Sequence, residues 1–244
     1  MSNLLHRRRI LSGEFKNPFS YVFDGVNEFI NTQRAWPHPR TQVFSISFFI
    51  YQLALGTNSI LDNVTIAATD PGIMLRVVSG KVIFILQSSA ASRLQIESVL
   101  TTTANSWNYV TVNYSGDSNG NNCSIYINGV NSAVSVVVNS LALSSTSANN
   151  ILIGRDIGNS NYLNGYINQI YVSTSYTITL LVHAKIYNGG KPKNPLTHIS
   201  NLSHLFMVDT DYFTGSNHVV IDKKSVLGSS VNMELADKIR FSPY

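Results

Sequence analysis

The sequence is short of charge, of cysteine and of long apolar runs, and each shortage excludes a class of protein. Charged residues are 12% of the 244 residues, about half the usual share. The single cysteine, Cys123, excludes an intrachain disulfide framework. No run approaches the roughly 18 apolar residues of a membrane-spanning helix, so we expect no membrane insertion. With 44% apolar residues the chain can still bury a large core, as one large domain or two small ones.

The net charge of +4 is concentrated at the two ends of the chain. Residues 1–40 carry six basic and three acidic side chains, and residues 181–244 carry seven and five. Residues 41–180 carry four and five, so this part lacks the basic stripe that nucleic-acid binding needs. We therefore expect no nucleic-acid partner. The surplus of Asn, Ser and Thr instead favours contact with carbohydrate or with other subunits.

Three segments are expected along the chain. Residues 1–18, with Arg7-Arg8-Arg9, are predicted to be a flexible basic arm, either a frayed terminus or a segment that orders on a neighbouring subunit. No apolar run of signal length follows the arginines, so we expect synthesis in a cytoplasm without secretion. Residues 19–190 are predicted to form the main domain, and residues 191–244 to complete or extend it.

Short strands separated by polar turns dominate the main domain. Val43–Gln52 alternates between apolar and polar residues, and Lys81–Gln87 is almost continuously apolar. Asn128-Gly129 supplies the two positive φ angles of a type I′ hairpin turn. About a dozen such strands indicate a sandwich of two antiparallel sheets. One helix is predicted on its surface, over Thr177–Tyr187, because apolar residues recur there at helical spacing before the stop signal Gly189-Gly190.

Six segments in a fixed order carry a family resemblance: Phe23–Ile30, Phe44–Phe48, Trp107–Val110, Ser124–Val130, Ile151–Gly154 and Asn161–Ile170. They resemble successive strands of the concanavalin A-like lectin/glucanase (laminin-G-like) jelly rolls. Two further segments, Ile186–Lys193 and Val231–Ile239, resemble the versions found in tailed-phage virion proteins. The resemblance implies an all-β jelly-roll sandwich of two antiparallel sheets with one short surface helix.

Asn168 and Gln169 stand where the family usually has acidic residues. Strict alternation places Asn168 on the same face as Ile170 and Val172, which predicts that its side chain points into the core. An amide is cheaper to bury than a carboxylate. The departure therefore puts in doubt any role that the acids have in relatives.

Catalytic residues of the glucanase kind are missing from the sequence. Those enzymes need two carboxylates on one strand face, but none of the four glutamates, Glu14, Glu28, Glu97 and Glu234, has an acidic residue two or four positions further on. The six histidines are scattered and form no nucleophile or zinc motif. We expect no enzyme. A divergent glycoside hydrolase whose carboxylates converge from distant strands is the alternative.

Calcium is the one cofactor that the resemblance raises, because laminin-G-like relatives often bind it at a sandwich edge. Oxygen-bearing side chains suit this ion, and the candidates are Asp156 with Asn159 and Asn161, and separately Asp117. The alternative is that these short polar side chains cap their own backbone in Asx turns.

Glycan contact calls for an aromatic ring beside planar polar groups, and the candidates are Trp36, Tyr162 and Asn161. The two rings could equally be packing residues. Together these observations favour a non-enzymatic phage virion structural protein, a capsid decoration or a tail or fibre component. Its expected partners are other virion proteins and further copies of itself, and its expected location is the virion, after synthesis in the host cytoplasm. The alternative is a carbohydrate-binding adhesin that recognises host surface glycans.

Overall fold

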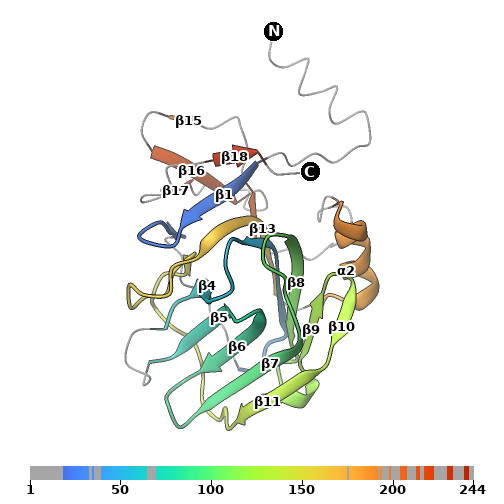
Figure 1. Ribbon diagram of the computed structural model, residues 1–244. Helices are drawn as coiled ribbons and strands as arrows, with labels where there is room; N and C mark the ends of the chain where they lie inside the picture. Colours follow the sequence, from blue (N-terminus) through green and yellow to red (C-terminus); the bar gives the residue numbers. More distant parts are fainter. Residues whose placement is uncertain are drawn as a thin grey trace.

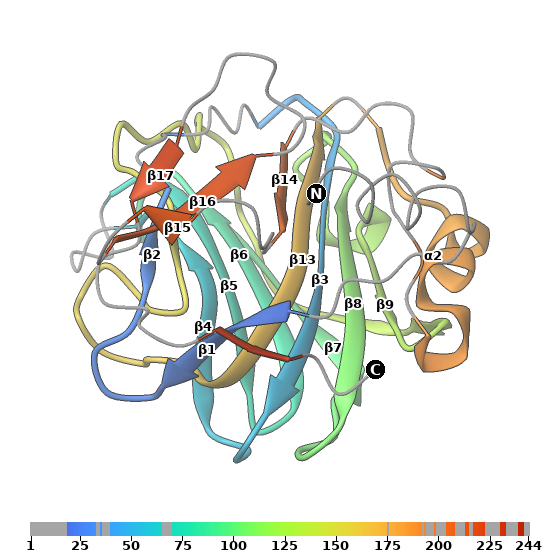
Figure 2. The ribbon, with the colours of Figure 1, turned by 90° about the horizontal axis from the view of Figure 1, so that it is seen from above.

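Two antiparallel sheets lie face to face and enclose the apolar core (Figure 1). The computed structural model describes residues 19–32, 35, 40–64, 70–174, 176–191, 193 and 198, together with the backbone of five short strands between residues 204 and 241. Figure 2 shows β13, β3 and β8 of one sheet lying over β4–β7 of the other. The predicted all-β sandwich with one short helix is confirmed.

Within the described residues, the larger sheet has 11 strands. Its main path runs β10 (Val130–Ser132), β9 (Ser124–Ile127), β8 (Trp107–Tyr114), β3 (Phe44–Gln52), β13 (Asn164–Thr174), β14 (His204–Met207), β16 (Asn217–Asp222) and β15 (Phe213–Thr214). Off this path lie β1 (Phe19–Asp24), which pairs with β13 and with β18 (Ile239–Phe241), and β17 (Ser230–Asn232), which pairs with β16. The division into arm, main domain and C-terminal segment stays a prediction, since residues 1–18 lie outside the described part.

The smaller sheet has seven strands in the part of the chain that the structure describes. Their order is β11 (Val134–Asn139), β7 (Arg93–Thr101), β6 (Lys81–Gln87), β5 (Gly72–Val78), β4 (Thr57–Asp62), β12 (Leu152–Ile153) and β2 (Ile30–Asn31). The chain enters this sheet and leaves it several times. Loops between the strands are therefore brought together at the two ends of the sandwich, as in other antiparallel sandwiches.

The core consists of the alternate residues that face each other across the two sheets. On β3 these are Phe44, Ile46, Phe48 and Ile50, as the alternation predicted, and they are buried together with the inward residues of β5 and β6. The ring of Phe44 meets that of Phe84 edge-on, with 6.1 Å between centroids. Such interlocking of aromatic rings is a favourable packing geometry.

A β-bulge in β13 reverses the predicted direction of Asn168. Asn168 is paired with Phe49 of β3, and the register then shifts so that the next pair is Tyr171 with Ser47. Directly paired residues project to the same side of a sheet, and Phe49 lies on the outer face. Asn168 therefore lies on the outer face, while Ile170 remains in the core. The prediction that Asn168 points inward was wrong, because it assumed strict alternation across a bulge in which two residues of β13, Gln169 and Ile170, oppose the single residue Phe48 of β3.

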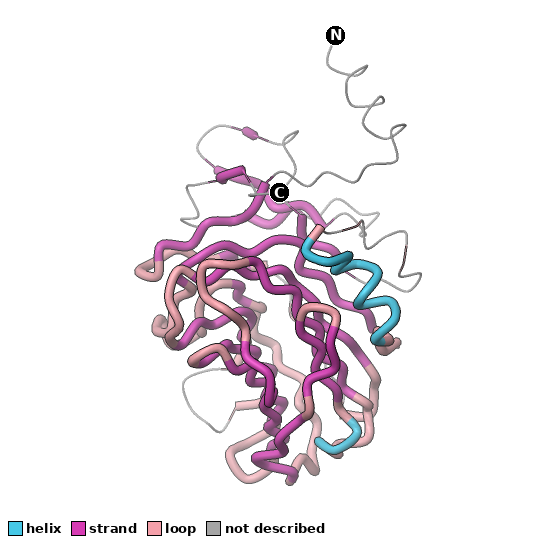
Figure 3. The backbone as a smooth tube through the Cα atoms, turned by 45° about the vertical axis from the view of Figure 1, so that its right-hand side comes forward, coloured by secondary structure: helices cyan, strands magenta, loops and turns pink. Residues whose placement is uncertain are grey.

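The helix α2 (Leu180–Tyr187) covers part of the outer face of the larger sheet, and Figure 3 shows it on the outside of the strands. It begins later than the predicted Thr177. Thr179 is the N-cap, with extended φ and ψ, and its side chain accepts a hydrogen bond from the Val182 N–H. The apolar residue Ile178 is buried before the helix starts, where its N–H donates to Ser45 Oγ at 2.9 Å. Two short 3-10 helices, η1 (Gly120–Asn122) and η2 (Asn188–Gly190), complete the fold.

His183 fixes α2 to the sheet through both of its ring nitrogens. The backbone N–H of Gly129 donates to Nε2 at 3.0 Å, so the proton of the neutral ring is on Nδ1, which lies 2.8 Å from Thr111 Oγ1. The ring stacks on Tyr109 with 4.4 Å between centroids. Gly129 belongs to the predicted Asn128-Gly129 turn, where both residues have positive φ. The histidine is thus a buried structural residue and not an exposed reactive group.

Replacement of Gly165 tests the tight contact between β13 and β3. A Cβ at Gly165 would lie 2.0 Å from the carbonyl oxygen of Tyr51, so Gly165→Ala must push two paired strands apart. We expect a loss of about 3 kcal/mol in the free energy of unfolding. The measurement is urea denaturation followed by circular dichroism.

Gly56→Ala is the matched control, because a Cβ there would meet nothing within 4 Å. Equal stabilities of the two variants would contradict the described β3–β13 contact.

Candidate functional site

The β12–β13 loop, residues 154–163, brings four of the predicted site residues together. Asp156 is buried at its centre and accepts hydrogen bonds from the Ser160 N–H at 2.7 Å and from Asn161 Nδ2 at 2.6 Å. The Asn159 N–H donates to the Asp156 carbonyl. Asn159 and Asn161 have φ angles of 57° and 52°, a region that asparagine tolerates better than most residues. The loop is therefore held in one shape by its own short polar side chains.

Two residues that the sequence analysis missed lie beneath this loop. Arg76, on the outer face of β5, places Nη2 3.0 Å from Asp62 Oδ2 and 3.6 Å from Asp156 Oδ2. Asp62, at the end of β4, is fully buried, and its Oδ1 accepts a hydrogen bond from the Val64 N–H. Asp62, Arg76 and Asp156, which carry the three charges, are far apart in the sequence. The signal that could have found them is Asp62 itself, an acid that ends the apolar run Ile60-Leu61.

Burial raises the pKa of Asp62 to about 6, although the charge of Arg76 and the Val64 N–H both act to lower it. At neutral pH the carboxyl is still ionised and paired with the guanidinium. A buried charge is tolerated when it has both a charged partner and a hydrogen bond. Here the ion pair serves to tie β4, β5 and the β12–β13 loop together.

The groups around the predicted calcium residues do not fit calcium. The oxygens of Asp156 accept from N–H and O–H donors of Ser160, from an amide N–H₂ of Asn161, and face a guanidinium. Calcium needs six to eight oxygen ligands, whereas these neighbours present hydrogens. Among the described residues, no group of three His, Cys, Asp or Glu side chains is placed to hold a metal ion.

Asp117 lies in a different loop, between β8 and β9, and its surroundings are of the same kind. It accepts hydrogen bonds from the Ser115 hydroxyl, from the amide of Asn122 and from the Asn119 N–H, which together lower the pKa of its carboxyl. This is the Asx-turn arrangement that the sequence left open as the alternative. We therefore assign no calcium role to Asp117 or to Asp156 with Asn159.

Tyr162 is half-buried at the end of the β12–β13 loop. Its hydroxyl lies 3.4 Å from Arg155 Nη1, and the guanidinium of Arg155 lies 3.3 Å from the centroid of the Phe29 ring. The loop thus presents an aromatic ring, a cation and the polar side chains of Asn159 and Asn161 in one small region. The other predicted aromatic, Trp36, lies outside the described residues.

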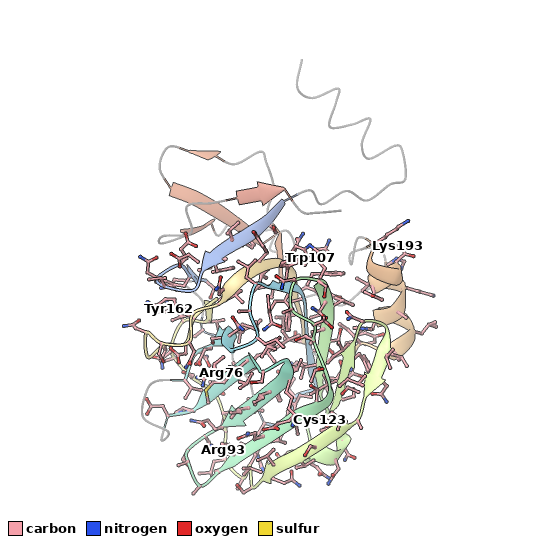
Figure 4. The ribbon with its side chains drawn as sticks, in the orientation of Figure 1. Arg76, Arg93, Trp107, Cys123, Tyr162 and Lys193 are labelled. Atoms are coloured by element: carbon pink, nitrogen blue, oxygen red, sulfur yellow. The ribbon has the colours of Figure 1, made fainter. Side chains whose placement is uncertain are left out.

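A second aromatic surface was not predicted. Tyr51, Trp107 and Tyr166 come from β3, β8 and β13, and they are neighbours through the pairs Tyr51–Trp107 and Tyr51–Tyr166. Their ring centroids are 5.5 to 6.4 Å apart, and all three rings are partly exposed. Figure 4 shows Trp107 well separated from Tyr162. Strand register alone brings these rings together, so the sequence offered no local signal for them.

The acids Asp62 and Asp156 do not form a hydrolytic pair. A retaining or inverting glycosidase needs two carboxyl groups that both reach the sugar. Asp62 is fully buried, and Arg76 lies within ion-pair distance of both acids. Both acids are thus held within the chain by Arg76, and the fully buried Asp62 cannot reach a bound sugar.

The stacked antiparallel sheets and the loops at their ends define a lectin-type sandwich. Residues 24–177 match the family described as the concanavalin A-like lectin/glucanases superfamily, and the chain belongs to it. No curated protein sequence matches the chain. The fold is therefore lectin-like and of carbohydrate-binding type, and such folds are not typically enzymatic.

Solved structures show the same fold at low sequence identity. A heptameric SAP-like pentraxin from Limulus polyphemus is 16% identical, with 92% of this chain and 94% of the pentraxin covered and a TM-score of 0.56. A candidate carbohydrate-binding protein from Bacteroides ovatus is also 16% identical, with 94% of this chain and 61% of that protein covered and a TM-score of 0.61. The CBM40 of a Ruminococcus gnavus IT-sialidase is 13% identical, with 68% and 98% covered and a TM-score of 0.51.

The burial of His183 in its neutral form predicts that the folded protein loses stability in acid. Burial lowers its pKa from 6.5 to about 3 in the folded protein, so between these pH values the unfolded chain binds more protons than the folded one. The free energy of unfolding must then fall as the pH falls from about 6.5 towards 3. Asp62 acts in the opposite direction between pH 6 and 3.8, because its folded pKa is raised.

We expect His183→Gln to flatten the acid side of the stability profile and Asp62→Asn to steepen it, measured by urea denaturation between pH 7 and 4. The Gln carbonyl can still accept from the Gly129 N–H. Parallel profiles for wild type and His183→Gln would show that the histidine is not buried in its neutral form.

Proposed function

We propose that this chain is a non-enzymatic glycan-binding protein whose ligand site is the β12–β13 loop. The observation that carries the proposal is one short loop in which Tyr162 lies beside Arg155, while Asn161 and the backbone of Asn159 are held by the buried Asp156. A few polar groups beside an apolar surface, on a preformed scaffold, are what small-ligand sites share. The likeness in fold to a candidate carbohydrate-binding protein and to a CBM40 supports the same class of ligand.

Each group has a distinct role in this site. The Tyr162 ring offers a flat surface for the apolar face of a sugar. The amides of Asn159 and Asn161 can both donate to and accept from hydroxyl groups, and the fixed fork of Arg155 suits ligands with a carboxylate. Host surface glycans carry the matching groups, which are apolar sugar faces, hydroxyl groups and carboxylates. The chain is therefore an adhesin in this proposal.

Tyr162 provides the direct test. On a glycan array and then by calorimetry with the best ligand, Tyr162→Ala should weaken binding about tenfold or more, because the stacking surface is lost. Tyr162→Phe keeps the ring and should bind nearly as well as the wild type.

Trp107→Ala is the matched control on the separate aromatic surface. If Trp107→Ala abolishes binding while Tyr162→Ala leaves it intact, the ligand lies on the outer face of the larger sheet and the loop is not the site. A chain that binds no glycan on the array contradicts the proposed function as a whole.

A virion structural role is the second proposal, and it is compatible with the first. It is supported by the resemblance of Ile186–Lys193 and Val231–Ile239 to tailed-phage virion proteins. It is also supported by residues 118–154, which contain no charged side chain and suit packing against other subunits. The protein would be a decoration of the capsid or a component of the tail or fibre, present as a homo-oligomer in contact with other virion proteins.

Purified particles test this second proposal. Mass spectrometry of virions banded on a density gradient should detect the chain at many copies per particle, in a constant ratio to the major capsid protein. Absence of the chain from particles, with its presence in the infected-cell lysate, would exclude the virion role without touching the glycan proposal.

A further inference from the structure

Arg76 has a position that is unusual for a surface arginine. It projects from the outer face of β5, yet three-quarters of its side chain is buried, with 25% exposed. One amino group lies within ion-pair distance of a carboxylate from β4 and of another from the β12–β13 loop. Figure 4 shows Arg76 on the same side of the sandwich as Tyr162.

We propose that the guanidinium of Arg76 takes the place of a divalent cation under the β12–β13 loop, so that the loop keeps its shape without calcium. Asp62 and Asp156 are 0% and 8% exposed at their side chains. Two nearly buried carboxylates repel each other and lose hydration, so they require a positive partner. Arg76 supplies that charge from within the chain.

The remaining contacts of the two acids are consistent with an internal partner. Asp62 receives the Val64 N–H, and Asp156 receives the Ser160 N–H and hydroxyl and the Asn161 amide. Each of these groups donates to a carboxylate oxygen, so with Arg76 in place the two carboxylates are satisfied within the chain and present no open set of ligands to a metal. A guanidinium also remains charged at every pH that a folded protein survives, so the loop does not depend on the concentration of any ion.

The ion pair of Arg76 has one consequence for the proposed function. This consequence rests on the β12–β13 loop being the ligand site. Binding of a glycan there should be unaffected by a chelator. The proposal about Arg76 itself concerns stability and does not require that any glycan binds.

Thermal unfolding of four proteins tests the proposal: the wild type, Arg76→Ala, Arg93→Ala, and the triple variant R76A/D62N/D156N. Each is measured with EDTA and with calcium. Arg93 is the matched control, because it lies on the outer face of the same sheet and has no salt bridge within the described part of the chain. We expect the Tm of Arg76→Ala to fall by about 5–10 °C and that of Arg93→Ala to fall by no more than about 2 °C.

Calcium should distinguish the variants. It should raise the Tm of Arg76→Ala, in which two carboxylates are freed, but not that of the wild type or of the triple variant. The triple variant should be more stable than Arg76→Ala, because the unpaired charges are gone, and it keeps the test informative if Arg76→Ala does not fold.

Three results would overturn the proposal. The first is a wild type whose Tm rises with calcium or falls with EDTA. The second is an Arg76→Ala variant as stable as Arg93→Ala, or one whose Tm calcium leaves unchanged. The third is a triple variant no more stable than Arg76→Ala. Because the readout is Tm, none of these results bears on whether Tyr162 binds a glycan.

Discussion

The pairing of β3 with β8 on one side and β13 on the other is the constraint on which the rest of the structure depends. The inward side chains of β3 form the centre of the core, whereas its outward side chain Phe49 belongs to the apolar cluster under α2. Ser45 and Ser47 belong to the polar contacts beneath the segment that leads into α2. Tyr51 lies between Trp107 and Tyr166. One strand thus organises the interior, the helix and an aromatic surface.

Side chains alternate between the two faces of a strand, and this period of two residues made most of the sandwich predictable. Val43–Gln52 and Lys81–Gln87 are strands within one residue of the predicted limits. The first was recognised by its alternation and the second by its short, almost continuous apolar run. The same rule of alternation failed at Asn168, where the bulge adds one residue that no local pattern reveals. The start of α2 was misplaced for a related reason, since Ile178 is apolar but is buried ahead of the helix.

Only part of the candidate site could be predicted from the sequence. Asp156, Asn159, Asn161 and Tyr162 are neighbours along the chain, so their loop could be recognised from its own residues. Arg76 and Asp62 come from other strands, and the Tyr51–Trp107–Tyr166 cluster comes from three strands. Contacts of this kind follow from tertiary register, which depends on every loop length between the strands. The loop itself combines rigidity with a polar surface, and this combination is what a lectin-like site requires.

The position of β1 has a consequence for the order in which the chain can fold. Phe19–Asp24 pairs with residues 164–167 of β13 and with β18, and with no strand between them in the described part of the sequence. Among the described strands, β1 therefore has no partner until about 145 further residues have been made. Such a long-range closure is entropically slow. The apolar residues of β1 stay unpaired until residues 164–167 are available, and the pairing of β1 with β13 is a late event in the folding of the larger sheet.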